Sequence, residues 1–292
     1  MKISFVIPAY NEQMNIGAVL SQLRSNFPQA EIIVVDDAST DDTSQEAAKY
    51  NPDKVIRHNN NRGNGAALKT GIKNASGDFV IFVDSDGQHP IEEVIKVVNA
   101  VEATPGIDAV FTKRENIYAS GMIRAAGKIM IRQVVSSLTG EHNEDHNCGL
   151  KAFRTEKILP FLFMLPDGFS LHTTSMVLAY KEDFKVQWIN IRMEKRTQGK
   201  SRVSISDGFK TLVLVIRLIL IFDPLKFFMP ISLYSLFVGL VSISISLFQN
   251  RTIGKNYIFF FLFSMLIFIL GMLSEQISML RKEITFIKNE RR

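Results

Sequence analysis

The chain has a single cysteine, Cys148, and neither internal repeats nor low-complexity runs in its 292 residues. One thiol cannot form an intrachain disulfide, so a disulfide scaffold is excluded and a reducing compartment is favoured. The net charge of +5 is not accompanied by interleaved aromatic and basic residues, so we expect no nucleic acid as a partner. Met1–Ser4 lead directly into an apolar run, and no cleavable signal peptide is expected.

Apolar segments alternate with helix-like segments through the first hundred residues. Residues 3–7, 31–35 and 79–83 are rich in β-branched and aromatic residues, which is typical of buried strands, and residues 54–58 are predicted as a further strand between the last two, the third of four in chain order. Polar turns and helix-like segments follow them, including a helix predicted over 91–103. The alternation predicts an α/β fold with a parallel, doubly wound sheet. The chain is long enough for one such domain of about 200 residues and for a further C-terminal segment.

The fourth of these strands ends at two carboxylates separated by one residue, Asp84 and Asp86, with the amide of Gln88 close behind. The carboxyl ends of strands are where open α/β sheets bind their ligands. Oxygen donors of this kind suit a hard divalent ion such as Mg²⁺ or Mn²⁺, which would in turn hold phosphates. Taken alone, two acids one residue apart are more often an ordinary acidic turn, but the motifs upstream favour the metal site.

Four blocks stand in order along the chain: Pro8–Glu12, Val35–Thr43, Arg62–Ala67 and Asp84–Pro90. Together they resemble the signature motifs of the GT-A glycosyltransferases of family 2, most of all the dolichyl- and polyprenyl-phosphate sugar synthases. The resemblance covers residues 1–205 and, through the C-terminal apolar segments, the whole chain. It implies a GT-A, Rossmann-like, doubly wound sheet and a nucleotide diphosphate sugar, UDP- or GDP-hexose, as donor. Many members have Lys where this chain has Asn64, which puts a phosphate contact from that loop in doubt.

The resemblance also implies roles for individual residues. The base and ribose pocket would be lined by Pro8, Tyr10, Glu12 and Asp37. The metal, Mg²⁺ or Mn²⁺, and the donor diphosphate would be held by Asp84, Asp86 and Gln88, with Asp86 also near the sugar. The segment Glu194–Ser201 is similar to the family's R-x-x-G-[KE]-S loop, in which Arg196 and Lys200 would grip the leaving diphosphate.

Basic residues in the middle of the chain are candidates for an acceptor site. Arg114 follows a strand predicted at 109–112, and Arg124 begins a row of basic residues spaced by four along a helix predicted over 121–138. A cationic helix face is usually only solvated. The family resemblance places the acceptor site in this segment and implies that Arg114 and Arg124 bind the acceptor phosphate. Asp145 and the block Gly149–Arg154 resemble a further family motif, D-x-x-x-G-[FL]-[RK].

The segment Phe169–Ser175 lacks the acidic residue that many family members carry, and it offers only His172 and hydroxyl groups. A hydroxyl acceptor needs a base to remove its proton, whereas a phosphate monoester is already largely dianionic at neutral pH. A site with two arginines but no extra carboxylate therefore favours a phosphate acceptor, although Asp86 or Asp145 could still act as a base.

Two uncharged apolar runs, 227–247 and 257–273, occupy the C-terminal part of the chain. As helices they would be about 32 and 26 Å long, enough to cross a hydrocarbon core of ~30 Å, the second marginally. A buried helical hairpin is the alternative, but neither run has a polar stripe. Lysines and arginines gather before and after the pair, so the positive-inside rule places the catalytic domain in the cytoplasm, next to an anionic membrane surface.

These features divide the chain into four parts. We expect a GT-A catalytic domain at 1–205, an interfacial helix at 206–224, two transmembrane helices within 225–275 and a basic cytoplasmic tail at 276–292.

The expected activity is inverting, metal-dependent transfer of a hexose from a nucleotide diphosphate sugar to a polyprenyl phosphate, dolichyl or undecaprenyl, at the cytoplasmic membrane face. A membrane-anchored transferase acting on a glycan or lipid hydroxyl and a catalytically silent nucleotide-sugar-binding scaffold are the alternatives. The sequence leaves open the donor nucleotide, the sugar, the lipid length and homo-oligomerisation.

Overall fold

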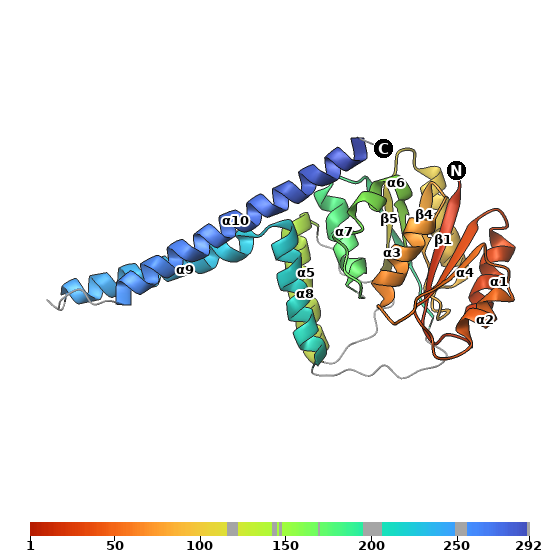
Figure 1. Cartoon of the computed structure of the whole chain (residues 1–292), viewed down its shortest axis with the longest axis horizontal. Coiled ribbons are helices and arrows are strands. Elements are labelled where there is room, and N and C mark those ends of the chain that lie inside the picture. Colours follow the sequence, from red (N-terminus) through yellow and green to blue (C-terminus); the bar gives the residue numbers. More distant parts are fainter. Residues whose placement is uncertain are drawn as a thin grey trace. The chain divides into compact units, whose positions relative to one another are not determined.

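The computed structural model of the chain describes residues 1–115, 122–141, 145, 148–168, 170–194, 206–248 and 256–290 (Figure 1). The chain forms two compact units, Met1–Ile205 and Ser206–Arg292. The first unit contains the β-sheet and helices α1 to α7, and the second contains helices α8 to α10.

One seven-stranded sheet organises the first unit, in the order β3-β2-β1-β4-β6-β5-β7. Its strands are β1 (Ile3–Ala9), β2 (Glu31–Asp36), β3 (Lys54–Arg57), β4 (Phe79–Phe82), β5 (Ala109–Arg114), β6 (Lys151–Arg154) and β7 (Val186–Ile191). The first four strands pair in parallel, as the alternation of strands and helices predicts. Their carboxyl ends therefore meet at one edge of the sheet.

The prediction of a fully parallel sheet is wrong at β6, which pairs antiparallel with both β4 and β5. A parallel strand would need a crossover to the opposite edge of the sheet before it began. The chain does not make that crossover. The backbone N–H of Arg114, at the end of β5, donates to the Asp145 carboxylate at 3.0 Å, so the segment leading into β6 already lies at the edge where β5 ends. A strand that starts there runs opposite to β5.

Helices cover both faces of the sheet, which confirms the doubly wound α/β class (Figure 1). Alternate residues of a strand point to opposite faces. On one face Phe5 of β1 is buried in the core cluster formed with α1 (Ile16–Asn26) and α4 (Ile91–Ala103). On the other face Ile33 of β2 packs with Ala67 of α3 (Asn64–Asn74). The remaining helical elements are α2 (Thr43–Ala48), α5 (Met122–Thr139), α6 (Thr155–Ile158), a 3-10 turn (Leu159–Phe161) and α7 (Leu171–Lys181).

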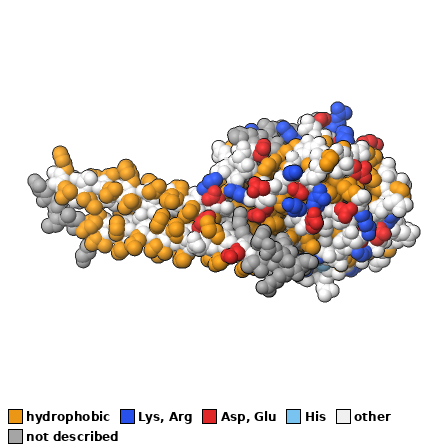
Figure 2. All heavy atoms as spheres, turned by 90° about the horizontal axis from the view of Figure 1, so that it is seen from above, with side chains coloured by type: hydrophobic (Ala, Val, Ile, Leu, Met, Phe, Trp, Pro, Cys, Tyr) orange, Lys and Arg blue, Asp and Glu red, His pale blue; other side chains and the backbone are white. Residues whose placement is uncertain are grey.

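The second unit consists of α8 (Ser206–Phe222), α9 (Leu225–Phe248) and α10 (Asn256–Glu290). The segments Leu225–Phe248 and Tyr257–Leu280 are long and apolar enough to cross a membrane, and they contain the two runs predicted from the sequence. Hydrophobic side chains cover most of the face of these helices that Figure 2 shows.

Small residues bring α9 and α10 together. The Ser232 hydroxyl donates to the Ser264 carbonyl oxygen at 3.0 Å, and the Ser264 hydroxyl donates to the Ser232 carbonyl oxygen at 2.9 Å. Closer to the turn, the Ser235 hydroxyl donates to the Phe260 carbonyl oxygen at 3.0 Å, and a Cβ at Gly239 would lie 3.2 Å from the Phe260 Cβ. Close contact between small residues is the usual basis of helix pairing in lipid, where the hydrophobic effect does not drive helices together.

Candidate functional site

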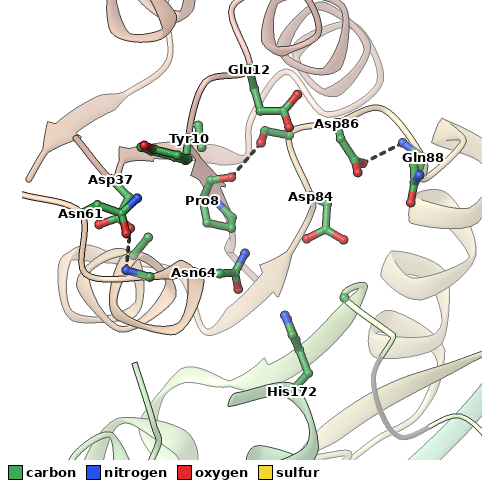
Figure 3. Close-up of a pocket in the computed structure, with 15 residues that line it drawn as sticks. Pro8, Tyr10, Glu12, Asp37, Asn61, Asn64, Asp84, Asp86, Gln88 and His172 are labelled. Carbon is green, nitrogen blue, oxygen red and sulfur yellow. Dashed lines mark hydrogen bonds between the residues drawn. The ribbon is translucent and has the colours of Figure 1, made fainter. Parts of the chain in front are cut away.

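A cavity of about 460 Å³ lies at the carboxyl edge of the parallel strands (Figure 3). Its 15 lining residues come from the ends of β1, β2 and β4, the start of α3, the segment before β6 and the start of α7. The structure brings seven of the predicted site residues together here: Pro8, Tyr10, Glu12, Asp37, Asp84, Asp86 and Gln88. The cavity is acidic, because four of its described lining residues are Asp or Glu and none is Lys or Arg.

The loops after β1 and β2 form one wall of the cavity and hold each other in place. The Asn11 backbone N–H donates to the Ser39 hydroxyl at 3.0 Å, and the Thr40 N–H donates back to the Asn11 side-chain oxygen at 2.8 Å. These bonds fix the turn in which Asn11 has a positive φ of 56°. Tyr10, directly before it, keeps 45% of its surface exposed and presents a flat ring at the cavity.

Asp37 is buried and ties the loop after β3 to the wall. Its carboxylate accepts hydrogen bonds from the backbone N–H groups of Arg62 (2.9 Å) and Gly63 (2.6 Å). The His58 Nδ1 lies 2.7 Å from the same carboxylate. A carboxylate has about four acceptor positions, so most of its capacity is used inside the protein. Asp37 therefore positions the loop as well as lining the cavity.

Asp84, Asp86 and Gln88 stand on the loop that follows β4. The Ser85 hydroxyl donates to the Pro8 carbonyl oxygen at 2.8 Å, and the Gln88 N–H donates to Asp86 Oδ1 at 3.1 Å. A Cβ at Gly149 would collide with the Asp84 carboxylate, so only glycine leaves room for that side chain in its present place.

The described residues contain no group of three or more His, Cys, Asp or Glu side chains that could hold a metal ion. Mg²⁺ in particular is often held by one or two carboxylates together with waters and substrate phosphates rather than by a complete protein cage. Two carboxylates on one loop of an acidic cavity fit that kind of site. Asp84, Asp86 and the Gln88 amide thus suit a Mg²⁺ or Mn²⁺ ion that is completed by a diphosphate.

Arg114, a predicted acceptor residue, is the last residue of β5 and does not line the cavity. Its Nε donates to Asp145 Oδ2 at 2.7 Å and its Nη2 donates to Asp145 Oδ1 at 2.8 Å. Burial acts to raise the pKa of Asp145, but the hydrogen bonds and charge of Arg114 outweigh it and hold that pKa below its usual value. This pair is not apparent from the sequence because its two residues are 31 positions apart in the chain.

The structure does not describe the side chains of the other predicted cationic site residues, Arg124, Arg196 and Lys200. Arg124 lies on α5, and the position of its side chain is outside the described structure. Arg196 and Lys200 also lie outside the described residues. The Glu194 N–H donates to the Gln88 carbonyl oxygen at 3.1 Å, so the chain that leads toward Arg196 starts beside the Asp84–Gln88 loop.

Lys151, His89 and His172 have buried side chains, and His172 also lines the cavity. The Lys151 Nζ, in the first residue of β6, is fully buried, donates to the His172 carbonyl oxygen and lies 5.3 Å from the centroid of the Phe111 ring. His89 is also buried, with its Nε2 3.9 Å from Asp84 Oδ2. In the sequence, His172 stood out only as part of a segment that lacks an acidic residue. The burial of Lys151 was predictable, because its neighbours in Leu150–Phe153 are apolar.

Burial keeps His172 uncharged. Its imidazole is 2% exposed, and desolvation, followed by the nearby Lys151 and His89, lowers the pKa of His172 to about 3. Burial likewise lowers the pKa of Lys151 to about 8, with partial compensation from the charges of Cys148 and Asp145. At neutral pH the imidazole therefore has one N–H donor and one nitrogen acceptor.

We expect the fold to lose stability in mild acid through His172. Unfolded histidine titrates near ~6.5, so between pH ~6.5 and ~3 the unfolded chain binds one more proton here than the folded chain. The free energy of unfolding therefore falls as the pH is lowered, by about 2 kcal/mol from this residue at pH ~5. Denaturant titration in detergent near pH 7.5 and pH 5 measures the loss. The His172→Gln variant should lose about 2 kcal/mol less than the wild type, and equal losses would contradict a neutral buried imidazole.

Comparison with known proteins gives two family matches. Residues 4–157 match the family model described as glycosyl transferase family 2, and residues 223–280 match the one described as GtrB C-terminal hairpin. The first match covers more than half of the chain.

Among curated proteins, an undecaprenyl-phosphate 4-deoxy-4-formamido-L-arabinose transferase of Aeromonas hydrophila is 33% identical over 198 residues, which are 62% of this chain and 60% of the relative. The protein of the same name from Proteus mirabilis is 33% identical over 199 residues, with the same coverage. The matched region thus spans about 60% of the length of these relatives.

Among solved structures, the glucosyl-3-phosphoglycerate synthase of Mycobacterium tuberculosis in complex with Mn²⁺, UDP and phosphoglyceric acid has a TM-score of 0.61. It is 22% identical, and the match covers 75% of this chain and 77% of the synthase. At this level of identity the likeness shows the GT-A fold.

Proposed function

Because this chain belongs to glycosyltransferase family 2, we propose that it transfers a hexose from a nucleotide diphosphate sugar to a polyprenyl phosphate at a membrane surface. The observation that carries this proposal is the acidic cavity at the carboxyl edge of the sheet, with Asp84 and Asp86 on one loop and no Lys or Arg among its described lining. A cation held by these carboxylates would offset the charge of a donor diphosphate in such a cavity. The name of the curated relatives, undecaprenyl-phosphate sugar transferases, supports the lipid phosphate as acceptor.

Asp84, Asp86 and Gln88 would hold the metal with the donor diphosphate. When bound, the ion would neutralise charge that develops on the leaving diphosphate. The neighbouring wall would bind the nucleoside, with the exposed ring of Tyr10 as a stacking surface for the base and Asp37 near the ribose.

The reaction would be a single displacement with inversion at the anomeric carbon. An oxygen of the acceptor phosphate forms the new bond to that carbon while the bond to the donor diphosphate breaks. No proton has to be removed from the acceptor, since a phosphate monoester is largely dianionic at neutral pH. Arg114 and Arg124 would align the acceptor phosphate, and Arg196 and Lys200 would stabilise the departing diphosphate.

A hydroxyl acceptor would need a general base, and Asp145 is poorly suited to that role. Its carboxylate is 3% exposed and is bound by both the side chain and the backbone of Arg114. A carboxylate whose pKa is held low by a cation is a weak base. This pairing favours the phosphate acceptor over the hydroxyl acceptor.

A transfer assay with the detergent-purified full chain tests the function. UDP- and GDP-hexoses labelled in the sugar are offered with a polyprenyl phosphate or with the matching polyprenol, with Mn²⁺ or with excess EDTA. We expect label in the lipid phase only with the phosphorylated acceptor and free metal ion. Equal transfer to the polyprenol would establish a hydroxyl acceptor, and no transfer from any donor would favour a silent scaffold.

The hairpin would anchor the chain with both of its ends in the cytoplasm, which is a prediction about topology. We expect cysteines introduced at Glu102 and Asn289, in a Cys148→Ser background, to react with an impermeant maleimide only after the cytoplasmic membrane is permeabilised. A cysteine at Lys255, which stands between the two helices in the sequence, should react in cells with that membrane intact. Glu102 is exposed on α4, so failure to label it is not caused by burial in the fold. The opposite pattern of labelling would invert the topology.

A further inference from the structure

Two uncharged side chains in the cavity have buried polar atoms without a hydrogen-bond partner in the described part of the structure. They are Asn64, through its Oδ1, and His172, through its Nδ1. Figure 3 shows both side chains projecting into the cavity that Asp84 also lines. Buried polar atoms in native proteins nearly always have partners, and an exception inside a ligand cavity calls for an explanation. A bound ligand would supply the missing partners.

We propose that Asn64 and His172 form a neutral subsite that hydrogen-bonds hydroxyl groups of the donor's sugar and so helps to select the sugar that is transferred. This inference rests on the proposed function, because it assumes that a nucleotide sugar occupies the cavity. It goes further by assigning a specificity role to two residues that are neither acidic nor basic at neutral pH.

The chemistry of the two side chains matches a hydroxyl group better than a phosphate. A neutral imidazole has one donor and one acceptor, and a carboxamide has both kinds of group. A sugar hydroxyl both donates and accepts, so it can pair with either side chain in either sense. A diphosphate offers only acceptor oxygens, and it would leave the Asn64 oxygen unpaired.

The surrounding structure holds His172 in a fixed place. Its carbonyl oxygen accepts hydrogen bonds from the buried Lys151 ammonium group and from the Ser175 hydroxyl, the latter at 3.2 Å. The imidazole meets the Phe82 ring edge to face, with 6.4 Å between ring centroids. Lys151 is thus a positioning residue for His172. A side chain held on both its backbone and its ring side can discriminate between hydroxyl positions, since it cannot move to follow a misplaced group.

The segment 166–168, which precedes α7, contacts the start of α3, where Asn64 stands. The Ala66 N–H, at the start of α3, donates to the Asp167 carbonyl oxygen at 2.9 Å, and the Leu171 N–H, at the start of α7, donates to the Gly168 carbonyl oxygen at 3.1 Å. A Cβ at Gly63 would lie 2.7 Å from the Asp167 oxygen, so the two segments are in close contact. Residues 166–168 therefore connect the segments that carry Asn64 and His172.

Calorimetry with Mn²⁺ separates sugar recognition from nucleotide recognition. The probes are a nucleoside diphosphate and the corresponding nucleotide sugar, UDP with UDP-glucose and GDP with GDP-mannose. For His172→Phe, which keeps an aromatic ring of similar shape, we expect the Kd of the diphosphate to change by less than about twofold and that of the nucleotide sugar to rise about tenfold or more. Asn64→Ala should show the same pattern with a smaller, several-fold rise. Asn74→Ala, at the far end of α3, is the matched control.

Deoxy-sugar donors identify the hydroxyl that is recognised. For the hydroxyl that contacts His172, the wild type should lose affinity for the deoxy donor, while His172→Phe should bind the deoxy and parent donors equally. If His172→Phe does not fold, as judged by thermal unfolding, His172→Gln gives the same test with one retained polar group. Nucleotide sugars that bind both variants as tightly as the wild type would overturn the subsite. A wild-type chain that binds neither diphosphate would instead refute the proposed function itself.

Discussion

Asp84→Ala and Asp86→Ala are each expected to lower the rate of sugar transfer by about 10³-fold or more. The described lining of the cavity contains no Lys or Arg, so under the proposed function the donor diphosphate would depend on a cation held by these carboxylates. Loss of that cation removes several kcal/mol of stabilisation from the developing charge of the leaving group. The measurement is single-turnover transfer of labelled sugar to a polyprenyl phosphate, together with Mn²⁺ binding by calorimetry.

Glu102→Ala is the matched control for this prediction, since it removes an exposed carboxylate from α4 of the same unit. It should transfer sugar at the wild-type rate, and all three variants should unfold at similar temperatures. Near-normal transfer by Asp84→Ala, or full activity in excess EDTA, would contradict the metal assignment. A large fall in melting temperature for the two aspartate variants alone would show that the carboxylates act on the fold.

The parallel half of the sheet could be predicted from the sequence because its signals are local. β1, β2 and β4 contain short apolar runs, β3 has only Val55 and Ile56 between two charged residues, and the polar residues at the ends of β1, β2 and β4 are gathered by the fold at one edge. The direction of β6 could not be predicted in this way. It depends on where the chain re-enters the sheet, and that is fixed by a contact between Arg114 and Asp145 across 31 positions.

The residues of the candidate site likewise fall into those with a local sequence signal and those without one. Asp84, Asp86 and Gln88 could be recognised because three oxygen-bearing side chains follow one strand within five residues. His172 and Lys151 come from different elements, and their neutral or buried state is a property of the packed core. The hydrogen bond from the Lys151 ammonium group to the His172 carbonyl oxygen cannot be predicted from the residues next to either position in the sequence. The structure thus adds the wall of the cavity that faces the expected sugar.

Arg114 is expected to serve the acceptor phosphate, and its pairing with Asp145 decides how that can be tested. Arg114→Ala alone would leave the Asp145 carboxylate buried without its cation, which costs about 3–5 kcal/mol of stability and would confuse folding with binding. The double variant Arg114→Gln with Asp145→Asn removes both charges and keeps two groups that can hydrogen-bond to each other. It should unfold close to the wild-type temperature.

With that double variant, kcat/KM for the polyprenyl phosphate should fall about 10- to 150-fold, the equivalent of losing a charge-assisted contact of roughly 1.5–3 kcal/mol. Donor affinity measured by calorimetry should change by less than about twofold. Asp145→Asn alone keeps the guanidinium charge and should retain most of the transfer rate. If the double variant is stable and keeps wild-type kinetics, the guanidinium serves the fold alone. The acceptor phosphate would then have to be bound elsewhere, and a hydroxyl acceptor would gain support because Arg114 would have no part in the reaction.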